Sequence, residues 1–278
     1  MGSERIRQLQ RLRGRAVPPL PDPLPVHVFD SHCHLDMLDV PVEEALAAAK
    51  AVGVTRIVTI GCDLASSRFA ADAAAEHDDV YAGVAIHPNE TTGISDAVLD
   101  DVAKLAALPR VRAVGETGLD YYRDWAPKDD QHRSFRGHID IAKRTGKALV
   151  IHDREAHDDV LRILREEGAP DKVVFHCFSG DAAMAKECAD RGYVMSFAGN
   201  VTFKNAEPLR EALRAAPADL LLVETDAPFL TPVPHRGKPN SSYLIPHTVR
   251  FMAEVKGVDV DELCAAIAAT GERVFGPW

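Results

Sequence analysis

The chain has 278 residues, of which 46% are hydrophobic, and its formal net charge at pH 7 is −10. This length and hydrophobic content are sufficient for one domain with a sizeable core. The acidic balance excludes a protein that holds nucleic acid through a broad basic surface, so any nucleic-acid substrate has to be bound locally.

The N-terminal segment differs in composition from the rest of the chain. Five arginines lie between Arg5 and Arg15, and a proline-rich stretch follows up to Pro25. We expect residues 1–25 to form a flexible arm without the apolar core of a secretory signal, and residues 26–278 to form one domain. No apolar run approaches the roughly 20 residues that cross a membrane. The five cysteines, without a Cys-x-x-Cys pair, favour a reducing cytoplasm.

After the arm, short runs rich in β-branched residues alternate with segments of helical periodicity. The predicted strands are Val26–Asp30, Arg56–Ile60, Val80–Ile86, Val111–Gly115, Ala148–His152, Lys172–His176, Gly192–Ser196 and Leu220–Glu224. The clearest predicted helices are Val42–Ala51, Ala65–His77, Asp129–Arg144 and Arg154–Glu167. Eight strand–helix units indicate an α/β fold, the (β/α)8 TIM barrel, with its active site at the C-terminal ends of the strands. The alternative is an open doubly wound sheet, but no Gly-x-Gly-x-x-Gly turn follows the first strand.

The first predicted strand leads into two histidines. His32 and His34 are two residues apart, so in an extended chain both point to the same side, where two imidazoles can bind one divalent ion. Asp30 can orient a ligating ring. The alternative is a pair of structural histidines and a carboxylate that caps the strand end.

Later strands also end in residues that bind metals. Glu116 directly follows the fourth predicted strand and can bridge two ions, while His152 and His176 end the fifth and sixth strands. Each residue alone is more often a cap or a hydrogen-bonded core residue. Their matched placement at strand ends indicates one site. His87, just past the third strand, is expected to position substrate or to protonate a leaving group.

The last predicted strand ends in two carboxylates. Glu224 is expected to lie deeper in the barrel, whereas Asp226 can ligate a metal and accept the proton of an attacking water. The alternative is a solvated loop, but Pro228 and the apolar Phe229 and Leu230 favour a packed turn.

A short basic segment follows this strand. Arg236 suits bidentate contact with a phosphate, Asn240 suits a hydrogen bond, and Arg154 is a second candidate for phosphate binding. Charge alone indicates solvated surface, so this assignment depends on a metal site nearby. The aromatic residues that can either stack on a base or pack in the fold are Tyr121, Tyr122 and Phe203.

Together these motifs resemble the TatD family of metal-dependent hydrolases, in the amidohydrolase-like group of barrels. The matching motifs are Asp30–Asp36, Ile86–Pro88, Gly115–Tyr122, Ile151–His152, His176–Gly180, Glu224–Pro228 and Arg236–Asn240. They cover nearly the whole chain from Val28 onward. Three departures bear on substrate preference and leave the metal site intact: Asp153 in place of a small hydroxyl residue, Ser241-Ser242 in place of Glu-Pro, and the additional arm.

The resemblance implies a TIM barrel that holds two divalent metal ions. By motif position, the implied ligands are His32, His34, Glu116, His152, His176 and Asp226. Imidazole ligands favour zinc or manganese, whereas carboxylates and phosphate oxygens also suit magnesium. The implied reaction is phosphodiester cleavage, typically the trimming of DNA from a 3′ end.

The leading hypothesis is a metal-dependent deoxyribonuclease of the 3′–5′ exonuclease type, in which Asp226 takes a proton from water and Glu116 lies between the ions. Its expected substrate is single-stranded DNA or a DNA 3′ end, with no membrane and no obligate protein partner. The alternative is attack on a carbonyl, as in an amidohydrolase or an aminoacyl-tRNA deacylase. A non-catalytic metal-binding scaffold is disfavoured because the ligand set includes a carboxylate base.

Overall fold

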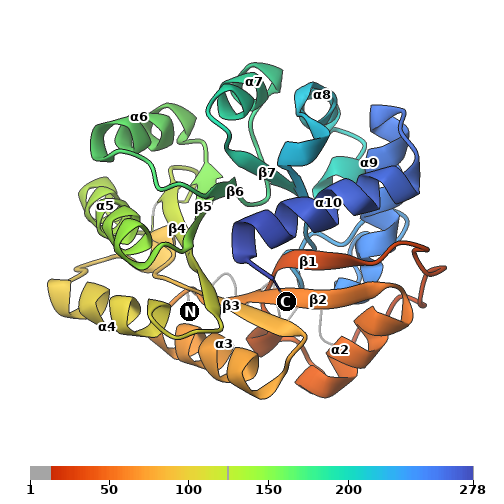
Figure 1. Cartoon of the computed structure of the whole chain (residues 1–278), viewed down its shortest axis with the longest axis horizontal. Helices are drawn as coiled ribbons and strands as arrows, with labels where there is room; N and C mark the ends of the chain where they lie inside the picture. Colours follow the sequence, from red (N-terminus) through yellow and green to blue (C-terminus); the bar gives the residue numbers. More distant parts are fainter. Residues whose placement is uncertain (1–13, 124, 278) are drawn as a thin grey trace. The chain divides into compact units, whose positions relative to one another are not determined.

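A computed structural model of the protein describes residues 14–123 and 125–277. Eight strands pair in chain order from β1 to β8 and alternate with helices (Figure 1). The strands are β1 Val28–Cys33, β2 Val54–Ile60, β3 Val80–Val84, β4 Val111–Asp120, β5 Ala148–Arg154, β6 Val173–Phe175, β7 Val194–Phe197 and β8 Leu221–Val223. The helices are α2 Val42–Ala51, α3 Leu64–Glu76, α4 Asp96–Ala106, α5 Lys128–Thr145, α6 His157–Glu167, α7 Ala182–Asp190, α8 Glu207–Ala215, α9 Ile245–Lys256 and α10 Val260–Phe275. The predicted (β/α)8 fold class is confirmed.

The chain divides into two compact units. Residues 59–176 form the first, which we call the middle unit. The second, the terminal unit, contains the described residues 14–58 and 177–277. Each unit carries its own strands and helices, and each contributes a separate group of the predicted site residues.

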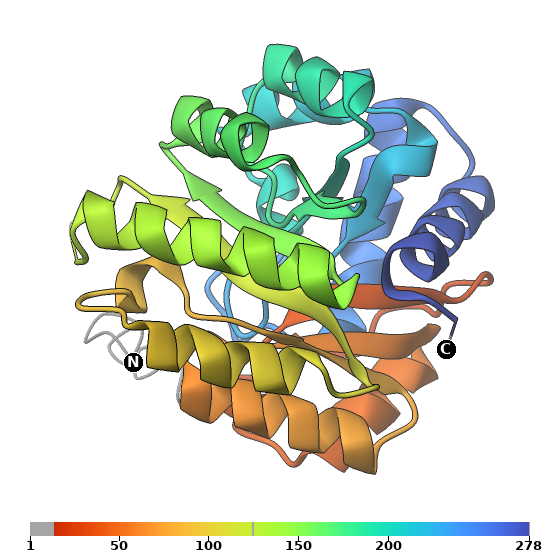
Figure 2. The same cartoon turned by 60° about the vertical axis from the view of Figure 1, so that its left-hand side comes forward.

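In the middle unit, strands β3 to β6 pair in parallel, helix α3 precedes β3, and helices α4 to α6 connect the four strands. Every residue of β3 is buried, as expected for a strand of a parallel sheet that is covered on both faces. Figure 2 shows α4 and α5 running side by side along the strands of this unit. Helix α6 buries the apolar face formed by Val160, Leu161, Ile163 and Leu164, which explains its strong helical periodicity.

Strands β4 and β5 are longer than predicted. Strand β4 continues to Asp120, so Glu116 lies inside the strand and not directly after it. The pairing of β4 with β5 shifts register between Val114 and Thr117. Strand β5 continues to Arg154, and α6 begins only at His157, so the helix predicted from Arg154 was too long at its start.

In the terminal unit, β7 pairs in parallel with β8, and the first strand lies beside the last. Cys33 and Ala227 form a parallel bridge, the His34 amide donates to Ala227 O at 2.9 Å, and the Asp226 amide donates to His32 O at 2.9 Å. Neighbouring first and last strands are a property of the barrel and not of the open doubly wound sheet.

Part of the N-terminal segment packs against the terminal unit. The Tyr243 hydroxyl donates to Pro18 O at 2.8 Å, and Leu24, which is 3% exposed, donates from its amide to Val52 O at 3.0 Å. The flexible arm expected for residues 1–25 is therefore not what the structure shows around Pro18 and Leu24. Residues 1–13, which contain most of its arginines, lie outside the described residues.

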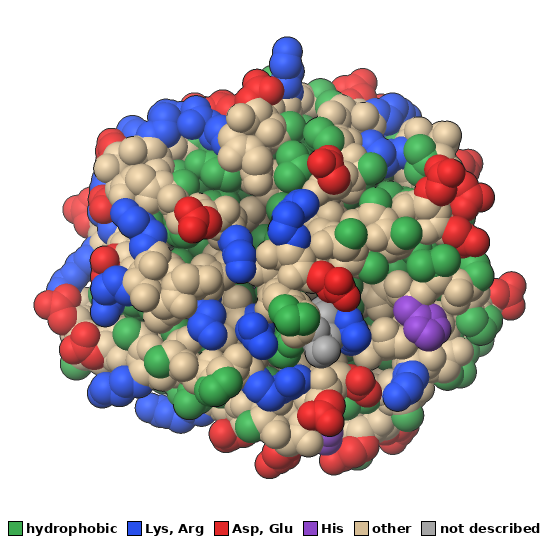
Figure 3. Space-filling view, in the orientation of Figure 1, with side chains coloured by type: hydrophobic (Ala, Val, Ile, Leu, Met, Phe, Trp, Pro, Cys, Tyr) green, Lys and Arg blue, Asp and Glu red, His purple; other side chains and the backbone are tan. Residues whose placement is uncertain are grey.

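Acidic and basic side chains lie interspersed over the face drawn in Figure 3. Among the described residues on this face, basic side chains alternate with acidic ones and do not form one continuous patch. Across the described ranges, no helix has both the length and the apolar character needed to cross a membrane.

Candidate functional site

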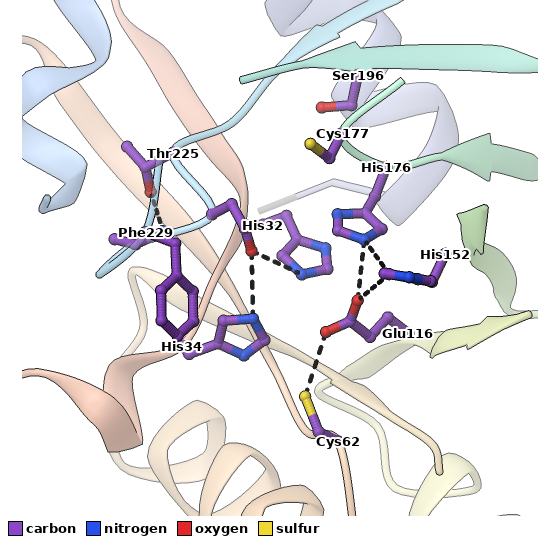
Figure 4. A network of polar contacts seen from close by, with 12 residues as sticks. His32, His34, Cys62, Glu116, His152, His176, Cys177, Ser196, Thr225 and Phe229 are labelled. Carbon is purple, nitrogen blue, oxygen red and sulfur yellow. Dashed lines mark hydrogen bonds and ion pairs between the residues drawn. The ribbon is translucent and has the colours of Figure 1, made fainter. Parts of the chain in front are cut away.

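In the middle unit, four of the predicted site residues converge. Glu116 is 1% exposed, and its Oε2 lies 2.9 Å from Nε2 of His176, 3.2 Å from Nδ1 of His152 and 3.7 Å from Nε2 of His87. Figure 4 shows Glu116 facing His152 and His176. We call these four residues the middle cluster. The structure therefore brings together side chains that are 89 positions apart in the sequence at their furthest, His87 and His176.

Neighbouring parallel strands deliver the middle cluster. Glu116 lies in β4 and His152 in β5, while His176 directly follows β6. Strand β4 can approach β5 closely because position 118 is a glycine with φ of +140°, and a Cβ there would lie 2.1 Å from His152 O. Any larger residue at position 118 would push the two strands, and therefore two members of the cluster, apart.

The cluster holds Glu116 in its ionised form. Burial alone would raise the pKa of Glu116, but electrostatic interactions with His87 and His176 and hydrogen bonds from His152 and His176 hold this pKa well below its usual range. Burial would lower the pKa of His152, yet hydrogen bonds to Asp120 and Glu116 raise it. A carboxylate that stays ionised in a buried place is suited to binding a cation.

Two residues that sequence reasoning missed support the cluster. Asp120 Oδ2 lies 3.1 Å from Nε2 of His152. Cys62 donates from Sγ to Glu116 Oε1 at 3.2 Å (Figure 4). Glu116, Gly118 and Asp120 are two residues apart along one strand. This spacing in the sequence was the signal that could have indicated Asp120 as a neighbour of the cluster. Cys62 gave no such signal because its contact with Glu116 depends on how β2 and β4 are placed.

The ring of His87 is held in one tautomer. Its Nδ1 accepts a hydrogen bond from the Asn89 amide at 3.0 Å, so the neutral ring carries its proton on Nε2. Just before it, the Ile86 amide donates to Nε2 of the buried His138 at 3.0 Å. Burial lowers the pKa of His138 to about 4, so His138 stays neutral and keeps this acceptor.

The terminal unit contains a second cluster. Nε2 of His34 lies 3.4 Å from Oδ1 of Asp226, and Nε2 of His32 lies 3.9 Å from the same oxygen. The two rings meet edge to face with centroids 5.2 Å apart. Both histidines are fully buried, whereas the Asp226 side chain is 15% exposed. We call these three residues the terminal cluster.

Asp30 supports the terminal cluster through the backbone and not through a histidine ring. Its Oδ1 accepts from the amides of Thr225 at 2.9 Å and His32 at 3.2 Å, and its Oδ2 accepts from Oγ of Ser242 at 2.8 Å. Burial raises the pKa of Asp30 to about 7 against these hydrogen bonds. The expectation that Asp30 orients a ligating ring differs from this arrangement, because the ordered groups are the main chains that carry His32 and Asp226.

Each cluster contains three side chains that could hold a divalent cation. Donor atoms bound to one Zn²⁺ at about 2.0–2.2 Å lie roughly 3–4 Å apart. The donor atoms of His87, Glu116 and His152 all lie within 4.8 Å of one another, as do those of His32, His34 and Asp226. Imidazole nitrogens mixed with carboxylate oxygens suit zinc or manganese.

The predicted phosphate-binding residues have different environments. Arg236 is exposed, with Cζ 4.3 Å from the centroid of the Phe203 ring, and Arg154 lies 3.8 Å over the ring of Tyr122. Asn240 is 2% exposed and donates to Thr225 O and Phe229 O at 2.9 and 2.6 Å. Asn240 thus orders the loop after β8, whereas the sequence predicted a hydrogen bond to substrate.

The chain is similar in sequence to a known protein family. The family model described as TatD related DNase matches residues 29–276. An "uncharacterized metal-dependent hydrolase TatD" of Mycobacterium tuberculosis is 46% identical over 260 residues, 90% of this chain and 98% of that protein.

Two solved structures have a similar fold. A TatD homologue of Escherichia coli, YJJV, has a TM-score of 0.84 at 26% identity, covering 90% of this chain and 98% of its own. An "uncharacterized amidohydrolase" of Saccharomyces cerevisiae has a TM-score of 0.76 at 18% identity, covering 89% and 100%.

Proposed function

Because the chain belongs to the TatD family, whose member in Mycobacterium tuberculosis is named a metal-dependent hydrolase, we propose that it hydrolyses phosphodiester bonds of DNA with two divalent cations. Glu116, His152 and His176 of the middle cluster would hold one cation, and the terminal cluster would hold the other. The observation that supports this most is the buried carboxylate of Glu116, with three imidazole nitrogens within 3.7 Å of one oxygen. The side chains of both clusters lie on or just after parallel strands, towards the C-terminal end where barrels of this class carry their active sites.

The chemistry divides between the cations and the chain. When bound, divalent cations lower the pKa of water and stabilise the charge that develops on phosphoryl oxygens. Asp226 accepts the proton of the attacking water, because it is the partly exposed carboxylate of the terminal cluster. His87 gives the proton on its Nε2 to the leaving oxygen, since its Nδ1 is occupied by the Asn89 amide.

Exposed arginine favours a phosphodiester over a neutral amide. Arg236 presents a planar guanidinium that matches two phosphate oxygens, and Arg154 lies two residues beyond His152 on β5. A hydrolase of small neutral amides has no use for these charges. The family model's description as a DNase supports the same substrate, and attack from a 3′ end is the mode we propose.

The test is a substrate panel. We expect the purified protein with Mn²⁺ to cleave a single-stranded oligodeoxynucleotide from its 3′ end, to lose this activity with chelator, and to leave aminoacyl-ester and amide substrates intact. Asp226→Asn should lower kcat by about 10²- to 10⁴-fold, the usual contribution of a general base. The control Glu211→Gln removes an exposed carboxylate of α8 and should leave kcat unchanged. Turnover of the ester or amide without cleavage of DNA would refute the proposal.

A further inference from the structure

Between β4 and α5, the described residues 121–123 and 125–127 include three aromatic side chains that stack with cationic ones. In each pair a cation lies over a ring: Lys128 over Tyr121 at 3.9 Å, Arg154 over Tyr122 at 3.8 Å, and Arg123 over Trp125 at 4.6 Å. All three pairs belong to the middle unit. Each of these three rings therefore has a cationic side chain over one of its faces.

Only one of these rings is well exposed. The Tyr121 hydroxyl donates to Asp159 Oδ2 at 2.5 Å and lies 2.6 Å from Nε2 of His132, so Tyr121 is anchored to the neighbouring helices. Tyr122 is 59% exposed, and among the described residues it is the only aromatic side chain in the group of large exposed hydrophobic residues. The structure thus separates the two adjacent tyrosines: Tyr121 packs, and Tyr122 is presented to solvent.

The exposed ring is tied to the middle cluster. Asp120 Oδ1 accepts hydrogen bonds from the amides of Tyr122 at 3.1 Å and Arg123 at 2.9 Å, while Oδ2 of the same carboxylate lies 3.1 Å from Nε2 of His152. Arg154, which stacks on Tyr122, is on the same strand as His152. One carboxylate and one strand therefore fix the Tyr122–Arg154 pair relative to a candidate metal ligand.

We propose that Tyr122, backed by Arg154, stacks on a nucleobase of single-stranded DNA bound at the middle cluster. A flat ring with a guanidinium on one face is the arrangement that proteins use to bind unpaired bases, and it needs no broad basic surface. The bases of a duplex interior are already stacked, so this contact selects an unpaired strand or a frayed end. The inference rests on the proposed function, and it adds the side chains that would recognise an unpaired base.

The test compares two 12-mers with the same number of phosphates. One is oligodeoxythymidylate and the other is fully abasic, and binding is measured by fluorescence anisotropy in chelator, so that no hydrolysis occurs. We expect the wild type to bind the base-bearing strand more tightly. Tyr122→Ala should weaken that binding by about 5- to 150-fold, the usual loss for one stacked base, and leave binding of the abasic strand unchanged. Tyr122→Phe keeps the ring and should bind both strands within about twofold of wild type.

Arg133→Ala is the matched control for charge. Arg133 is an exposed arginine of α5 that pairs with Asp96, so its loss should change the two affinities equally. Equal affinity of the wild type for the two strands, or an equal loss for both in Tyr122→Ala, would overturn the inference. The proposed function fails separately: if the wild type cleaves no DNA but Tyr122→Ala weakens only the base-bearing strand, the stacking site stands and the hydrolysis proposal falls.

Discussion

The middle and terminal clusters use the same kinds of ligand but expose their carboxylates differently. Glu116 lies inside strand β4 and its side chain is 1% exposed, whereas Asp226 follows β8 with φ of +54° and its side chain is 15% exposed. A buried carboxylate surrounded by imidazoles is suited to hold charge in place. A partly exposed carboxylate on a turn is suited to exchange a proton with water. In the proposed function each cluster holds a cation, and Asp226 of the terminal cluster in addition accepts the proton of water.

The supporting residues differ in the same way. In the middle cluster, Asp120 contacts the ring of His152 directly, so it acts on the orientation and charge of a ligand. In the terminal cluster, Asp30 instead accepts hydrogen bonds from main-chain amides, so it acts on the path of the chain. We therefore expect substitution of Asp120 to change metal binding by His152, and substitution of Asp30 to change the position of the main chain.

The largest expected effect comes from Glu116→Gln. An amide in place of the carboxylate removes the negative charge that faces three imidazole nitrogens. The cation of the middle cluster and hydrolysis should therefore both be lost, with kcat at least about 10²-fold lower. Asp226→Asn keeps an oxygen ligand and should lose hydrolysis while retaining its cation. Steady-state kinetics with circular dichroism as the check on folding would compare the two. Near-normal hydrolysis by Glu116→Gln would contradict the proposed role of Glu116 in holding a cation.

A smaller effect is expected for Asp120→Asn. The change removes the charge that raises the pKa of His152 and orients its ring, and loss of such a support typically weakens metal binding by about 10- to 100-fold. Competition with a chromophoric chelator measures this affinity. Asp129→Asn, an exposed residue at the start of α5, serves as the control and should match the wild type. If both variants behave alike, Asp120 does not support the cluster.

The smallest effect concerns pH and His138, which supports the backbone beside His87. Burial lowers the pKa of His138 to about 4 in the folded chain, so between about pH 6.5 and pH 4 the unfolded chain binds a proton that the folded chain does not. The free energy of unfolding should therefore fall as pH falls through this window, by at most about 1.4 kcal/mol per pH unit from this group.

His138→Gln can keep both hydrogen bonds without titrating, so its stability should depend less on pH in that window. Urea unfolding of the wild type and the variant at pH 7 and pH 5 would show this. The exposed His27→Gln is the control and should keep the pH dependence of the wild type. An equal decrease in the free energy of unfolding between pH 7 and pH 5 in the wild type and in His138→Gln would show that His138 does not cause the pH dependence.

Periodicity predicted the fold well because strands and helices differ in repeat and alternate regularly. It misplaced the ends of β4 and β5, because the register shift and close approach at Gly118 leave no periodic signal. Strand-end placement predicted both groups of histidines. The sequence pattern could not predict contacts between distant segments. Cys62 contacts Glu116 because of the fold, and the hydrogen bonds of Asn240 to Thr225 O and Phe229 O are likewise visible only in the structure.

The most direct measurement of the central claim is the number of divalent cations that each chain binds. Elemental analysis after saturation with Mn²⁺ and removal of free ions should give two ions per wild-type chain, one for Glu116→Gln and one for His34→Ala. A single ion in the wild type, or a count that neither substitution changes, would contradict the account of one cation in each cluster.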